Sequence, residues 1–155
     1  MRIIIVFLLL ITSCSPIKKY KETATKWEKD IIKLENLDKS KKLNKDAILF
    51  IGSSSIRLWR SIKKDLAPYE SIKRAYGGAR YTDLIHFTER LVSPHEVKAV
   101  GIFVANDITG GKNDLKPREV LHLSKLVVEQ IQKSHKNSPI FFIETTPLQK
   151  MESMG

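Results

Sequence analysis

The chain has 155 residues, of which 42% are hydrophobic and 28% charged, and these values fit one globular domain and exclude a disordered protein. Its net charge of +10 comes from 27 basic and 17 acidic residues, with a concentration of lysines in 18–45. Acidic residues alternate with these lysines and no aromatic stacking platform accompanies them, which argues against nucleic acid as a partner. Anionic lipid and acidic glycan remain compatible with the charge.

The N-terminus has the pattern of an export signal. Arg2 is followed by nine apolar residues, Ile3 to Ile11, a run too short to span a bilayer. The next residues end in Ser13-Cys14 and resemble a bacterial lipobox, whose cysteine is acylated and becomes the first mature residue. We therefore predict a lipoprotein exported to the bacterial envelope and anchored to the membrane through lipidated Cys14. An ordinary signal peptide with an incidental cysteine is the alternative. The predicted divisions are a signal peptide over 1–13, a tether over 14–21 and a folded domain over 22–155.

Strand-like and helix-like segments alternate along the rest of the chain. The patterns predict strands near 47–51, 71–75, 97–104 and 140–143, and helices over 22–37, 53–60, 81–91 and from Pro117 onward. Leu123, Val127 and Ile131 form the apolar stripe of the last helix, and Trp27 is interpreted as a packing residue. This alternation favours an α/β fold in which helices cover both faces of a parallel sheet.

The most informative stretch is AILFIGSSSIRLW at 47–59, where an apolar strand changes abruptly to glycine and three serines. Ligands of open α/β sheets bind beyond the carboxyl ends of the strands, close to the first N–H groups of the following helices. A serine at this turn is therefore a candidate nucleophile. Turn chemistry or helix capping also explains a serine cluster without any catalysis.

Four stretches together resemble successive blocks of the SGNH (GDSL-type) hydrolases. They are FIGSSSIRLW at 50–59, RAYGGARYTDL at 74–84, IFVANDI at 102–108 and PIFFIETTP at 139–147. The resemblance covers about 27–147 and implies a flavodoxin-like three-layer α/β/α sandwich with a parallel sheet, whose last strand and helix are missing here. It implies hydrolysis of a carboxylic ester, such as an acetylated glycan or a short-chain acyl ester, with no metal and no cofactor.

The resemblance also implies roles for three residues. Ser54 takes the place of the nucleophile, while the N–H of Gly78 and the side-chain amide of Asn106 take the places of oxyanion donors. The chain departs from the family pattern at Ser53, where aspartate is usual, and in the residues before Asn106. Ser53 or Ser55 as nucleophile remains an alternative. Positive φ in a turn could equally explain Gly78, and loop capping could explain Asn106.

The general base is the part of the pattern that this sequence lacks. In the family it comes from a D-x-x-H block near the C-terminus. Asp83 and His86 fit these letters, but they lie one turn apart on a predicted helix, where packing or exposure explains them. The resemblance therefore leaves two functions open, an ester hydrolase or a non-catalytic binding module or inactive fragment without the base.

Other chemistries have little support in the sequence. There is no H-E-x-x-H pattern, no cysteine pair and no phosphate-binding glycine loop, so we predict neither a metal nor a nucleotide site. Arg57, Arg80 and Lys112 lie near predicted strand ends and could contact an anionic or glycan substrate. Solvated surface charge is the simpler interpretation of all three. The sequence does not predict an oligomeric state.

Overall fold

The computed structural model describes residues 16–39 and 45–145, so the predicted signal peptide and Cys14 lie outside the described residues. The strands are β1 (Ile48–Gly52), β2 (Ser71–Ala75), β3 (Ala99–Phe103) and β4 (Ile140–Phe142). The helices are α1 (Pro16–Lys19), α2 (Lys21–Thr25), α3 (Glu28–Lys39), α4 (Ser54–Leu58), α5 (Ile62–Asp65), α6 (Tyr81–Val92) and α7 (Pro117–Ser134). The strands and the longer helices lie close to the predicted positions.

The four strands form one parallel sheet in the order β2-β1-β3-β4. In this sheet Gly52, at the end of β1, is paired with Ala75 at the end of β2 and with Phe103 at the end of β3. Three strands therefore end at the same level, and the loops that follow them leave from one edge of the sheet. The predicted α/β fold with a parallel sheet is confirmed.

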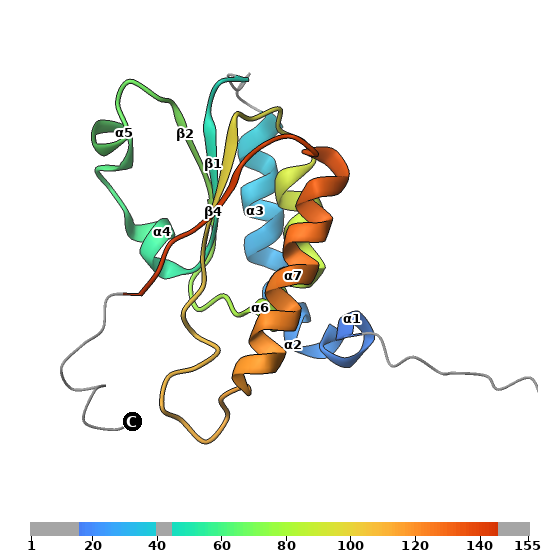
Figure 1. Ribbon diagram of the computed structural model, residues 1–155. Coiled ribbons are helices and arrows are strands. Elements are labelled where there is room, and N and C mark those ends of the chain that lie inside the picture. The colour runs from blue at the N-terminus through green and yellow to red at the C-terminus, as the bar shows by residue number, and fades with distance from the viewer. Residues whose placement is uncertain (1–15, 40–44, 146–155) are drawn as a thin grey trace, which may run out of the picture.

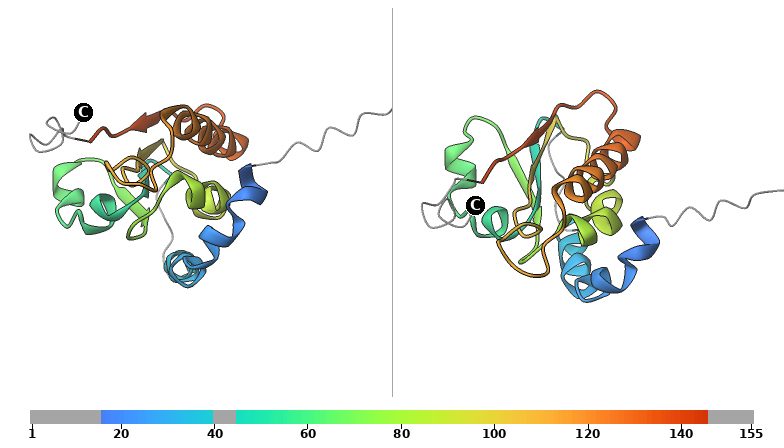
Figure 2. Two further views of the ribbon diagram at one scale, coloured as in Figure 1. Left: turned by 90° about the horizontal axis from the view of Figure 1, so that it is seen from below. Right: turned by 60° about the horizontal axis from the view of Figure 1, so that its bottom comes forward.

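Helices lie on both faces of the sheet, but they cover the two faces unequally. The long helices α3, α6 and α7 lie on one side, and the short helices α4 and α5 lie on the other (Figures 1 and 2). The largest buried cluster packs between the sheet and the long helices, and a smaller one, around Phe50 and Ile56, packs beneath α4 and α5. Leu123, Val127 and Ile131 of α7 are completely buried, which confirms the predicted stripe.

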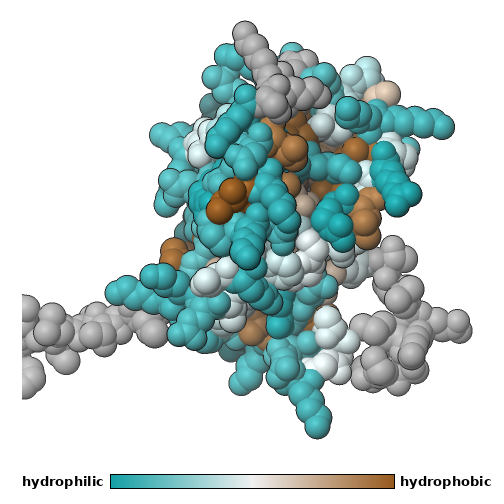
Figure 3. Space-filling view, turned by 180° about the vertical axis from the view of Figure 1, so that it is seen from behind, coloured by the Kyte–Doolittle hydropathy of each residue, from teal (hydrophilic) through white to brown (hydrophobic). Residues whose placement is uncertain are grey.

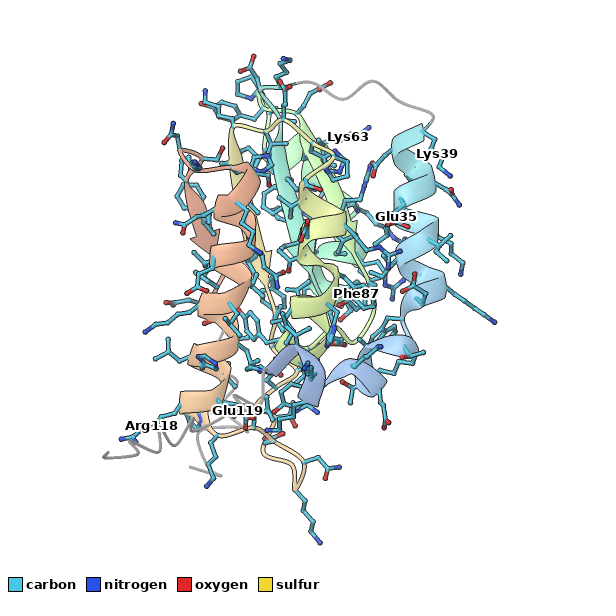
Figure 4. All side chains as sticks on the ribbon, turned by 90° about the vertical axis from the view of Figure 1, so that its right-hand side faces the viewer. Glu35, Lys39, Lys63, Phe87, Arg118 and Glu119 are labelled. Atoms are coloured by element: carbon cyan, nitrogen blue, oxygen red, sulfur yellow. The ribbon has the colours of Figure 1, made fainter. Side chains whose placement is uncertain are left out.

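The N-terminal helices pack against the long-helix layer. Instead of one helix over 22–37, the chain forms α2 and α3 with a break at Trp27, where the indole packs against the Tyr76 ring at a centroid distance of 5.3 Å. Arg90 of α6 donates to Glu35 and Glu28 of α3 at 2.7 and 2.9 Å, so α3 is attached to α6 by a double ion pair. Figure 4 shows the position of Glu35 on α3.

The beginning of the described chain contains a short helix. Residues Pro16–Lys19 form a helical turn, and Lys19 Nζ lies 2.6 Å from a carboxylate oxygen of Glu119 at the start of α7 (Figure 4). The hydroxyl of Tyr20 donates to the same carboxylate. Glu119 is an acidic residue in the first turn of α7, where it lies favourably near the positive end of the helix dipole. It also connects the first turn of the described chain to α7.

The face of the molecule opposite the viewer of Figure 1 is mostly hydrophilic. Figure 3, which shows the side away from the viewer in Figure 1, displays small separated hydrophobic patches on a hydrophilic background. No helix within the described ranges combines the length and hydrophobicity needed to cross a membrane. At the β4 edge of the sheet, however, Phe141 and Phe142 are 57% and 50% exposed, which is unusual for aromatic strand residues.

Candidate active site

The serine cluster begins where β1 leaves the sheet. Gly52 has φ of +128°, and a Cβ at this position would lie 2.0 Å from the carbonyl oxygen of Phe103. The next residue, Ser53, donates its backbone N–H to that same oxygen over 2.9 Å. Only glycine fits so close to β3, and this close approach fixes the point at which the chain turns from the sheet into α4.

The three serines differ in their exposure. Ser53 is buried at 1% exposure, Ser54 is half-buried at the first position of α4, and Ser55 is exposed. A nucleophile must reach both substrate and solvent, so burial argues against Ser53. Ser54 therefore remains the stronger candidate, and Ser55 remains the alternative.

The second loop follows β2 and lies next to the first. The N–H of Tyr76 donates to the carbonyl oxygen of Gly52 over 3.1 Å, which continues the pairing of β1 and β2 into the loops. Gly78 is exposed and has φ of +71°, a conformation that L-residues rarely adopt. A Cβ on Gly78 would make an ordinary contact with Trp27, so the backbone conformation, and not lack of space, is what favours glycine.

Asn106, in the loop after β3, is hydrogen bonded to the second loop. Its side-chain nitrogen donates to the carbonyl oxygen of Ala79 over 2.8 Å. An amide nitrogen carries two hydrogens, so this bond uses one and leaves the other available to a further acceptor. The loops that contain Gly78 and Asn106 are therefore held together directly.

Asp107 and Arg80 support these loops from behind. The buried carboxylate of Asp107 accepts the backbone N–H of Tyr81 over 2.9 Å, and Arg80 Nε lies 3.5 Å from its other oxygen. Arg80 also donates to the backbone carbonyls of Asp107 and Asn113, at 3.3 and 3.2 Å. Burial raises the pKa of Asp107. The role of Asp107 was not predicted, although an acidic residue beside Asn106 at a strand end was a visible signal. Arg80 was expected to be a surface charge or a substrate contact. Instead it binds backbone carbonyls of the loop after β3.

The pair Asp83 and His86 does not form a catalytic dyad. The Asp83 carboxylate accepts the backbone N–H of Arg80 over 2.9 Å and so caps the start of α6, and burial raises its pKa to about 6. His86 is half-buried on α6, on the opposite side of the sheet from α4, and burial lowers its pKa (Figure 1). This arrangement agrees with the structural interpretation of both residues.

The other histidines also lie away from the serine cluster. His95 precedes β3 and His135 precedes β4, so both lie at the amino ends of the strands, away from the serine cluster at the carboxyl end of β1. His135 Nε2 is 2.7 Å from the His95 carbonyl oxygen. His122 is exposed on α7. Within 16–39 and 45–145, no histidine is hydrogen bonded to a serine of the cluster, and no group of three His, Cys, Asp or Glu side chains is arranged to hold a metal ion.

Comparison with known proteins adds information about the fold. No protein-family model matches the chain, and no curated protein matches it. Among solved structures, a proposed platelet activating factor from Streptococcus pneumoniae is similar, with a TM-score of 0.69 and 17% identity over 88% of this chain. A proposed acylhydrolase from Bacteroides fragilis is also similar, with a TM-score of 0.59 and 18% identity over 84% of this chain. The chain therefore shares an α/β fold with these two proteins.

The similarity covers only part of these proteins. The match spans 63% of the streptococcal chain, which is less than two thirds of its length, and 67% of the Bacteroides chain. At 17–18% identity, the similarity establishes a shared architecture and leaves activity and substrate open.

Proposed function

We propose that this protein is an ester hydrolase of the SGNH type with Ser54 as its nucleophile. The observation that carries the proposal is the common level of the three strand ends, because Ser54, Gly78 and Asn106 each follow one of them within three residues. The hydrogen bond from Asn106 to the Gly78 loop adds support. The similarity to a proposed acylhydrolase is consistent with this reaction class.

In the proposed reaction, Ser54 Oγ attacks the carbonyl carbon of the ester and its proton passes to a base. The N–H groups of Ser54 and Gly78 and the free amide hydrogen of Asn106 stabilise the negative charge that develops on the carbonyl oxygen. Each such donor contributes about 10² to 10³ in rate. The alcohol leaves with a proton, and water then hydrolyses the acyl-Ser54 ester. Among the described residues no histidine is hydrogen bonded to the serine cluster, so the proposal assigns this proton to no particular side chain.

Labelling with a fluorophosphonate, read by intact mass, tests the nucleophile. A single adduct on the 155-residue protein is expected, absent from Ser54→Ala and retained in the matched control Ser55→Ala. Loss of the adduct in Ser55→Ala alone would assign the nucleophile to Ser55. No adduct on folded protein would reject the hydrolase proposal for this chain.

A second candidate function is a binding module without turnover. It is favoured by one observation, that no described histidine is hydrogen bonded to the serine cluster. Such a module would bind an acetylated glycan or a short-chain acyl ester and leave it intact. Incubation with acetylated xylan and with 4-nitrophenyl acetate separates the two functions, because only the hydrolase releases acetate. Release from one of the two compounds would also indicate the substrate class.

We further propose that lipidated Cys14 anchors the domain to the membrane of a bacterial envelope. The proposal rests on the sequence pattern around this residue. We propose no nucleic-acid partner for the protein. In a bacterial host grown with labelled palmitate, the protein is expected to incorporate label and to sediment with membranes. Cys14→Ala should lose both properties, while a soluble, unlabelled wild-type protein would contradict the proposal.

A further inference from the structure

A pocket of about 400 Å³ lies between α3, α4 and the carboxyl end of β2. Trp27 and Leu34 line it from the side of α3, Arg57 lines it from α4, and Tyr76 and Gly77 line it from the end of β2. It is therefore built from both helical layers and from the edge strand that lies between them. This volume lies at the lower end of the range that is usual for small-molecule binding sites in proteins.

The pocket adjoins the candidate active site. Arg57 follows Ser54 by three residues on α4, so both lie on the same side of this short helix. Gly77 directly precedes Gly78 in the second loop, and Trp27 lies between the pocket and Gly78, within van der Waals reach of where a Gly78 Cβ would be. The candidate site and the pocket are therefore neighbours that share α4, the second loop and the Trp27 side chain.

The lining is apolar on one side and carries one uncompensated cation. The side chains of Trp27, Leu34 and Tyr76 provide the apolar wall. Lys33 and Asp30 also line the pocket, and their charges offset each other in an ion pair with 3.3 Å between Nζ and Oδ1. Among the described residues, no carboxylate forms an ion pair with Arg57.

Arg57 is an exposed residue of α4 whose side chain lies against the second loop. Its guanidinium atoms lie 3.4 to 3.7 Å from the position that a Cβ of Gly77 would occupy, which places the group across the glycine backbone. A guanidinium has a planar set of N–H donors that can bind an anion at this place. The second loop thus carries the candidate oxyanion donor and lies beside this cation.

We propose that the pocket binds a part of the ester substrate that combines an apolar group with one negative charge, and that Arg57 binds this charge. The inference rests on the proposed function for its link to an ester, but the binding itself needs no catalysis. It deepens that function because it distinguishes anionic esters from neutral ones.

The test uses two small probes of equal shape, 3-phenylpropionate and its neutral analogue 3-phenylpropanamide. Because Trp27 lines the pocket, its fluorescence reports occupation, and Trp27→Phe identifies the signal. At low salt the anion is expected to bind about tenfold more tightly than the amide. Arg57→Gln should remove this preference, and Lys33→Gln should change it less.

Arg118→Gln is the matched control, because Arg118 is an exposed arginine at the start of α7, away from α3 (Figure 4). It should keep the full preference for the anion. Equal binding of the two probes, or a preference that survives Arg57→Gln in folded protein, would overturn the inference, as would a lack of any saturable signal.

The same titration in Ser54→Ala separates this inference from the proposed function. Binding in both proteins without fluorophosphonate labelling of the wild type would keep the pocket and reject the hydrolase. Labelling of Ser54 without selective binding of the anion would keep the hydrolase and reject the pocket.

Discussion

Asp107 accepts the backbone N–H of Tyr81 over 2.9 Å, and this bond joins the loop after β3 to the start of α6. The carboxylate is buried, and Arg80 is its cationic neighbour. Its neighbour in the chain, Asn106, donates to Ala79. Two successive residues of the loop after β3 therefore bind the end of the loop after β2 and the first residue of α6. The proposed oxyanion donors depend on this double attachment.

Replacing Asp107 should weaken this attachment in a graded way. Asp107→Ala leaves the Tyr81 N–H without an acceptor and Arg80 without a counter-charge, so a loss of about 1–3 kcal/mol in the free energy of unfolding is expected. Asp107→Asn keeps an acceptor and should lose less. Urea unfolding gives the stability, and the rate of fluorophosphonate labelling at Ser54 gives the effect on the site. Equal stability of the alanine variant and the wild type would show that the carboxylate does not hold the loops.

Gly52 should tolerate no side chain. In Gly52→Ala the new Cβ would meet the Phe103 carbonyl oxygen at 2.0 Å, and the residue would also have to adopt φ of +128°. A loss of at least about 3 kcal/mol in the free energy of unfolding is expected, because both backbone strain and strand separation contribute. Gly77→Ala is the control, since its Cβ would contact only the movable Arg57 side chain and should cost less than about 1 kcal/mol. Similar unfolding midpoints for the two variants would contradict this account.

Asp83 should make the protein less stable as the pH rises. Burial raises its pKa from 3.8 to about 6, so between these values the unfolded chain has lost the proton that the folded protein keeps. The contribution of this group to stability therefore falls as the pH rises through this interval and is constant above it, with a total change of about 3 kcal/mol.

Asp83→Asn isolates this effect, because the amide oxygen can still accept the Arg80 N–H. The stability of the wild type relative to this variant should fall between pH 4 and about pH 6 and then level off, as measured by urea unfolding at each pH. A constant difference over this range would show that Asp83 titrates normally.

Much of the fold was predictable because its signals are local. Strand β2 lies at the predicted residues 71–75, and the completely buried Leu123, Val127 and Ile131 follow from helical periodicity. The break at Trp27 was not predictable in the same way, because periodicity continues through it. At this break Trp27 packs against Tyr76, a long-range contact that no local pattern contains.

The candidate site was predictable only in part. The positions of Ser54, Gly78 and Asn106 after successive strands follow from the pattern of a parallel sheet. The supporting roles of Asp107 and Arg80 depend on which loops become neighbours, and this information appears only when the sheet is formed. The catalytic roles themselves stay predictions until Ser54 is labelled.

The β4 edge should promote self-association. Phe141 is 57% exposed and Phe142 is 50% exposed, and both lie on an edge strand. Unpaired backbone groups of an edge strand can also bind another chain. Light scattering at increasing protein concentration should show association of the wild type, reduced in Phe142→Lys with a change in stability below about 1 kcal/mol. Leu58→Lys, at a residue that is 55% exposed on α4, is the control and should associate like the wild type. A monomeric wild type at all concentrations would contradict this prediction.

The double ion pair of Arg90 with Glu28 and Glu35 makes the position of α3 sensitive to ionic strength. These side chains are partly accessible to solvent, and at 1 M salt the Debye length falls to about 3 Å, which is comparable to the ion-pair distances. Helix α3 carries Leu34 and begins next to Trp27, so concentrated salt should loosen one wall of the pocket. The composition of the surrounding medium would then set how closely the pocket fits its ligand, through residues that never contact it.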